Sequence, residues 1–151
     1  MKIALASDHA GFELKEQVRK WLQDWDVQTE DFGCGSLDSV DYTDYAIPAV
    51  SAVGKGECDR AILVCGTGIG MSIAANKFPG IRASLCHDLF SAKATREHND
   101  SNVLCMGARV IGIDLAREIV RTWLDTDFAG GRHQRRIDKI AAIERRFCQS
   151  E

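Results

Sequence analysis

The sequence predicts an α/β fold, in which a parallel sheet of five strands is covered by helices on both faces. Three observations carry this prediction. Short apolar runs alternate with helical patterns along the chain, as when each helix returns the chain to begin another parallel strand. The length of 151 residues, with 45% hydrophobic residues, suits one compact domain. No internal repeat or linker-like segment divides the chain, so we expect a single domain over residues 1–151.

The amino-terminal part predicts two strands, each followed by a helix. Residues 2–6 are a short apolar run followed by a polar loop, as in a buried strand. A second strand is predicted over residues 27–32, a glycine-broken loop over 33–42 and a helix over 45–53. The helix between the two strands is indicated by hydrophobic residues that share one face: Leu14, Val18, Trp21, Leu22 and Trp25.

The remainder of the chain continues the alternation. The predicted strands are residues 61–64, 81–86 and 103–106. The predicted helices are residues 71–77, 89–97, 115–124 and a last one from 132 to about 148. Because no sixth strand follows the last helix, we expect that helix to dock on a partner subunit through Ile137 and Ile140.

Charge and composition exclude several classes of protein. The formal net charge of −3 gives no general attraction to nucleic acid or to an anionic membrane. The apolar runs are far too short to span a bilayer, and the first residues lack the hydrophobic core of a signal peptide, so we expect a cytoplasmic protein. No two of the six cysteines are spaced as Cys-x-x-Cys, which favours free thiols over disulfides or zinc.

Cys65 stands where the buried third strand should end. Three glycines follow at positions 66, 68 and 70 and allow a sharp turn into a short helix. The unpaired amides and positive dipole end of that helix favour a thiolate and could hold a developing oxyanion. Cys65 is therefore a candidate base or nucleophile, the alternative being a small buried apolar residue.

Other polar residues should lie at the same edge, because ligands bind beyond the carboxyl ends of parallel strands. Asp8 and His9 follow the first strand, and Arg109 follows the fifth. We place His98 and Asn99 in a loop at this edge, just before the fifth strand. An acid, histidines, a thiol and an arginine together indicate proton transfer on an anionic substrate.

Three other glycine-loop or cysteine-loop functions do not match. The dinucleotide fingerprint should follow the first strand, whereas the glycines of this chain follow the third. A Walker loop should end in Gly-Lys-Ser/Thr, which does not occur in this sequence. A cysteine phosphatase carries an arginine six positions after its cysteine, where this chain has Met71.

The basic segment 132–136 is short and has no interleaved aromatic residues, which argues against nucleic-acid binding.

Six motifs in order resemble those of the ribose-5-phosphate isomerase B family, which includes galactose-6-phosphate isomerase subunits. The likeness extends from Lys2 to about Ile143 and implies a Rossmann-like three-layer sandwich and a homodimer, possibly a dimer of dimers. The motifs are Ser7-Asp8-His9-Ala10-Gly11, Cys65-Gly66-Thr67-Gly68-Ile69-Gly70, Ala74-Ala75-Asn76-Lys77, His98-Asn99, Gly107-Ala108-Arg109-Val110 and Gly131-Arg132-His133-x-x-Arg136.

The resemblance also implies roles for individual residues. Cys65 would be the base of the isomerisation, since the family's other branch uses a glutamate aligned with Met71. His98 would open the sugar ring with Asp8 beside it, and Asn99 would contact the substrate. Thr67 and the loop Gly66, Gly68, Ile69 and Gly70 would hold the enediolate, while His9, Arg109, Arg132 and Arg136 would bind the phosphate.

The sequence therefore predicts a metal-independent and cofactor-free isomerase that interconverts ribose 5-phosphate and ribulose 5-phosphate. Another sugar phosphate remains an alternative, such as allose 6-phosphate, galactose 6-phosphate or a tetrose phosphate, because the loop around Tyr42 and Thr43 helps set pocket length. A non-catalytic sugar-phosphate or nucleotide-binding protein is a further alternative. Some phosphate-binding arginines are expected to come from the neighbouring subunit.

Overall fold

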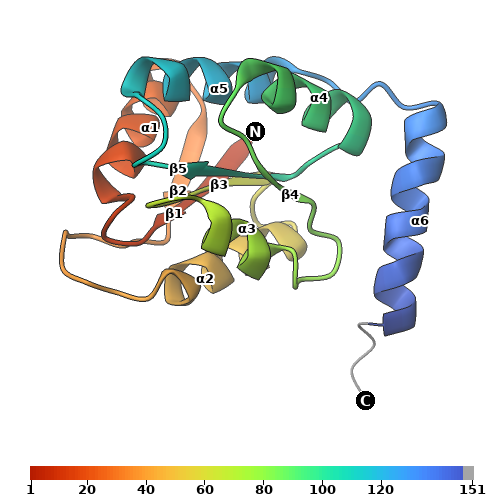
Figure 1. Cartoon of the computed structure of the whole chain (residues 1–151), viewed down its shortest axis with the longest axis horizontal. Helices are drawn as coiled ribbons and strands as arrows, with labels where there is room; N and C mark the ends of the chain where they lie inside the picture. The colour runs from red at the N-terminus through yellow and green to blue at the C-terminus, as the bar shows by residue number, and fades with distance from the viewer. Residues whose placement is uncertain (148–151) are drawn as a thin grey trace.

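The computed structural model describes residues 1–147 and shows a five-stranded parallel sheet between two layers of helices (Figure 1). The strands are ordered β2-β1-β3-β5-β4, so β1 and β3 lie side by side at the point where the strand order reverses. The predicted α/β three-layer architecture is confirmed. The strands are β1 (Lys2–Ser7), β2 (Gln28–Asp31), β3 (Arg60–Cys65), β4 (Ala83–Leu85) and β5 (Val103–Gly107).

Helices cover both faces of this sheet, and one helix stands apart at its side. Figure 1 shows α1, α4 and α5 on one face, α2 and α3 on the other, and α6 beside the sheet. Cys148 and the predicted end of α6 at about residue 148 lie outside the described residues. The helices are α1 (Phe12–Asp24), α2 (Tyr42–Gly54), α3 (Ile69–Ala75), α4 (Leu89–Asn99), α5 (Ile113–Asp125) and α6 (Arg132–Phe147).

Alternating side chains of the strands build two separate cores. In β1, Ile3 and Leu5 pack among the large side chains beneath α1 and α5, whereas Ala4 and Ala6 face α2 and α3. This alternation follows from the two-residue period of a strand. Cys65 lies in the second core, on the face covered by α2 and α3.

Several helices are longer than their patterns predicted, and α4 is one of them. The prediction ended this helix at residue 97, but it continues through Asn99. Asp100 then ends it in the left-handed conformation, at φ 45°, with its amide donating to the Arg96 carbonyl. Aspartate tolerates this conformation better than most residues, so no glycine was needed as an end signal.

The described helices, residues 1–147, include none that combines the length and apolar character needed to cross a membrane.

Candidate functional site

Cys65 ends β3 with its thiol turned toward the loop that follows. The Gly68 amide donates to its Sγ at 3.0 Å, and the side chain is buried. Gly68 has φ 74°, in the left-handed region, which turns the chain so that this amide faces the sulfur. The predicted juxtaposition of thiol and loop amide is therefore present.

Thr67 belongs to the glycine loop, and Tyr42 packs against the same loop. Thr67 is exposed, and its Oγ1 accepts a hydrogen bond from the Ile69 amide at 3.3 Å. Two of the amides predicted to hold an oxyanion, those of Gly68 and Ile69, thus donate within the loop itself. Tyr42 begins α2, and its ring covers Gly70 so closely that a Cβ there would lie 2.7 Å from the ring.

Asp8 and His9 follow β1, directly beside this loop. Asp8 is buried, and its Oδ1 accepts the Gly11 amide at 3.0 Å, which closes the turn into α1. The Val40 amide donates to Nδ1 of His9 at 3.2 Å. An accepting Nδ1 carries no proton, so His9 presents its Nε2–H as a donor. A donor of this kind suits the oxygens of an anionic substrate.

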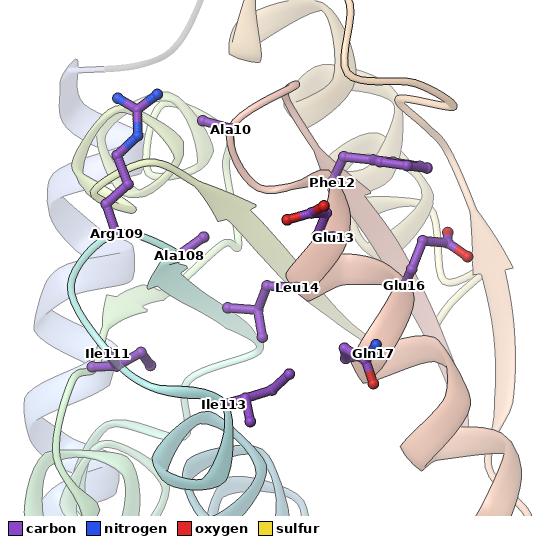
Figure 2. Close-up of a pocket in the computed structure, with 10 residues that line it drawn as sticks. All are labelled: Ala10, Phe12, Glu13, Leu14, Glu16, Gln17, Ala108, Arg109, Ile111 and Ile113. Atoms are coloured by element: carbon purple, nitrogen blue, oxygen red, sulfur yellow. The ribbon is translucent and has the colours of Figure 1, made fainter.

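Arg109 joins the same edge from the end of β5. Its amide donates to the Gly66 carbonyl at 3.0 Å, and its side chain, from Cδ to the guanidinium group, lies over Gly66. Figure 2 shows the side chain rising beside Ala10, away from the apolar end of a cavity of about 570 Å³ between α1 and the β5–α5 connection. Asp8, His9, Cys65, Thr67 and Arg109 are thus brought to one edge, as predicted.

His98 and Asn99 lie at the opposite edge of the sheet, and their predicted placement is wrong. Both belong to the last turn of α4, which leads into the start of β5. Val103 at that start pairs with Ala61, four residues before Cys65. Four residues of strand measure roughly 13 Å. Within one chain His98 therefore cannot act on a substrate held at Cys65.

The helix α6 adds its basic residues to the same opposite edge. The rings of His98 and His133 stack with centroids 4.4 Å apart, and Glu144 accepts the Gly80 amide near the other end of α6. Arg132 and Arg136 are exposed beside this stack. Burial, together with the charges of His98 and both arginines, lowers the pKa of His133.

One of the two side chains expected to contact a partner subunit is buried within its own chain. Ile137 was expected to pack on another subunit, but it is only 8% exposed because this side of α6 faces α4. It lies one turn after His133, on the same face. Ile140 and Ile143 remain 42% and 58% exposed.

Comparison with known proteins identifies the family. A family model described as "Ribose/Galactose Isomerase" matches residues 3–140. The chain belongs to this isomerase family. Ribose-5-phosphate isomerase B of Escherichia coli is 50% identical over 145 residues, which cover 96% of this chain and 97% of the relative. The structure of ribose-5-phosphate isomerase B from Clostridium thermocellum superposes with a TM-score of 0.96 at 50% identity, covering 97% of this chain and 99% of that one.

The isomerase family also includes a relative named for a different sugar phosphate. D-erythrulose-4-phosphate isomerase 2 of Mycolicibacterium smegmatis is 46% identical over 131 residues, covering 85% of this chain and 86% of the relative. Overall similarity therefore identifies the isomerase family more firmly than it identifies the sugar.

Two contacts made by candidate site residues were not predicted from the sequence. Val40, whose amide sets the proton position on His9, lies in a loop with no local signal for that contact. His133 belongs to the motif Gly131-Arg132-His133-x-x-Arg136, but its stacking on His98 joins residues far apart in the sequence and has no local signal. Among residues 1–147, no cluster of three or more His, Cys, Asp or Glu side chains is arranged to hold a metal ion.

Gly68→Ala should destabilise the isomerase more than Gly80→Ala does. Both glycines have positive φ, so alanine costs each about 1–2 kcal/mol in backbone strain. A Cβ at Gly68 would also lie 2.7 Å from the Met106 carbonyl carbon, whereas a Cβ at Gly80 would have no atom within 4 Å. Overpacking should add ~1–3 kcal/mol at Gly68. Urea unfolding of both variants measures the difference, and equal losses would contradict the packing argument.

Proposed function

We propose that this aldose–ketose isomerase interconverts ribose 5-phosphate and ribulose 5-phosphate, with Cys65 as the base. The observation that carries the proposal is the Cys65 thiol, held by the Gly68 amide beside an exposed threonine at the reversal point of the sheet. The similarity to ribose-5-phosphate isomerases B of two organisms supports the choice of sugar. We also infer a cytoplasmic enzyme that needs no metal or cofactor and does not bind nucleic acid.

The proposed reaction moves one proton between neighbouring carbons of the open-chain sugar. The Cys65 thiolate removes the proton from C2 of the aldose, which leaves an enediolate across C1 and C2. The same proton returns to C1, while a proton passes from the O2 hydroxyl to O1, so that the ketose forms without net gain or loss. The exposed Thr67 hydroxyl and the Gly70 amide would stabilise the enediolate oxygens, together with the loop dipole.

The phosphate would be held by donors from two chains. His9 and Arg109 lie at the Cys65 edge of one subunit, and the proton position on His9 makes its Nε2 a donor. Arg132 and Arg136 are at the other edge of the same subunit, so in this proposal they serve the site of the partner subunit. Arginine's planar fork suits phosphate oxygens.

The same geometry leads to a homodimer with two shared sites. His98 and Asn99 lie with Arg132 and Arg136, so we assign them to the partner's site as well, where His98 opens the sugar ring with Asp8 of the first subunit. The exposed Ile140 and Ile143 on α6 offer apolar surface for this assembly. A two-fold arrangement would complete both sites at once.

A substrate panel tests the proposed sugar. The purified enzyme should have its highest kcat/KM with ribose 5-phosphate, compared with allose 6-phosphate, galactose 6-phosphate and the tetrose phosphate that pairs with erythrulose 4-phosphate. The tetrose is the second candidate because a 46% identical relative is named for it. Higher kcat/KM with any of these would reassign the substrate, and turnover of none would favour a binding protein.

A further inference from the structure

The amide at the end of β5 is held by a side chain rather than by a neighbouring strand. The backbone ladder between β4 and β5 stops where the Cys86 amide donates to the Cys105 carbonyl. In a longer ladder the Gly107 amide, two residues on, would donate to a β4 carbonyl. It donates instead to Nε2 of His87 at 2.9 Å. The imidazole thus takes the place of a strand carbonyl.

Gly107 lies directly beneath the loop that carries Thr67. A Cβ on Gly107 would lie 2.6 Å from the Thr67 carbonyl carbon, so the two backbones are in close contact. The residue after Gly107 is also bonded to this part of the chain, because the Ala108 amide donates to the Cys65 carbonyl at 2.9 Å. The position of Gly107 therefore sets the position of Thr67 and of the Gly68 amide that follows.

The His87 ring is neutral in this arrangement. An Nε2 atom that accepts an N–H bond has no proton of its own, so the hydrogen is on Nδ1. Partial burial lowers the pKa of His87, against the opposing effect of Asp88, and this favours the neutral ring. His87 lies two residues beyond the end of β4 and belongs to none of the six motifs.

We propose that His87 is a positioning residue of the isomerase. By holding the Gly107 amide, its Nε2 fixes the backbone on which Thr67 and Gly68 rest, and so keeps the Thr67 hydroxyl and the Gly68 amide in register with the Cys65 thiol. The catalytic consequence rests on the proposed function, whereas the geometric part concerns Cys65 itself. Because the effect is on the enediolate stage, His87 acts on kcat rather than on substrate binding.

Two substitutions of similar size separate the hydrogen bond from packing. Glutamine can place a carbonyl oxygen near the position of Nε2, whereas leucine fills the space without an acceptor. His87→Leu should lower kcat about ten-fold with little change in KM, the effect of leaving one buried amide unsatisfied. His87→Gln should recover most of the loss. Steady-state kinetics on whichever sugar phosphate the wild type turns over measures both.

The alkylation rate of Cys65 gives a readout that needs no substrate. Because the Gly68 amide supports the sulfur, displacement of the loop should slow iodoacetamide alkylation of Cys65 several-fold in His87→Leu but not in His87→Gln. Peptide mass spectrometry reports the reaction at Cys65 alone. Slow alkylation in the leucine variant with rescue by glutamine supports the positioning role even if the proposed reaction fails.

Two results would overturn the inference. One is wild-type kcat and wild-type Cys65 alkylation in a folded His87→Leu enzyme. The other is equal impairment of the leucine and glutamine variants, which would assign the effect to ring packing. Thermal unfolding of each variant, with kcat expressed per folded enzyme, removes any contribution from misfolded protein.

Discussion

Replacing Cys65 by alanine is expected to lower turnover at least ~10²-fold, the lower range for loss of a positioned acid–base group. The fold should survive, because the change removes one sulfur from a side chain at the end of β3 and leaves the glycine loop intact. Steady-state kinetics with ribose 5-phosphate measures the loss, and circular dichroism checks the fold. Iodoacetamide should inactivate the wild type likewise, with substrate protecting.

Cys58 provides the matched control for this experiment. It is also a buried cysteine, but it precedes β3 and lies at the opposite edge of the sheet. Burial raises the pKa of its thiol, which should keep it slow to alkylate. Cys58→Ala should therefore retain turnover. If Cys65→Ala is fully active, the proposed proton transfer by this thiol is wrong.

Mixing two inactive variants should restore activity if the site is shared between subunits. Cys65→Ala removes the base from one edge of the sheet, and His98→Ala removes the ring-opening residue from the other. In a heterodimer one site collects both substitutions and the other collects neither. After random exchange in a two-fold dimer, about one quarter of the sites should be intact, and activity should recover in that proportion.

A second mixture controls for unspecific recovery. Thr67 belongs to the same loop as Cys65, so Cys65→Ala mixed with Thr67→Ala should stay inactive, since every site would carry at least one substitution. Native mass spectrometry verifies that heterodimers form in both mixtures. No recovery in the first mixture, with heterodimers present, would place Cys65 and His98 in the same subunit's site.

The sequence predicted the geometry at the strand ends correctly because its signals are local. A buried run ending in Cys65 and followed by three glycines indicates both the end of a strand and a turn with positive φ, and Gly68 adopts that φ. Asp8, His9 and Arg109 reach the same edge because parallel strands share their carboxyl ends. Among residues 1–147, the five strands and the five helices with predicted bounds lie within a few residues of the prediction, and the predicted apolar face 14–25 lies on or next to α1.

The errors concern contacts between distant segments. The patterns of α4 and α6 identified both helices, but not that the rings of His98 and His133 stack. They also did not indicate that Ile137 would be buried within its own chain. The hydrogen bonds from Val40 to His9 and from Gly107 to His87 likewise join separate elements, at 31 and 20 residues of separation.

The sequence by itself determined an α/β fold with a thiol and a glycine loop at a strand end, and the resemblance of its six motifs to a known family indicated an isomerase. Hydrophobic periodicity and glycine torsions are properties of short segments, so they can be read without knowing how distant segments pack. Only the tertiary structure decided which edge receives His98, Asn99, Arg132 and Arg136. α4 ends at the start of β5, and the packing of α6 on α4 places the basic residues there, about one strand length away from Cys65.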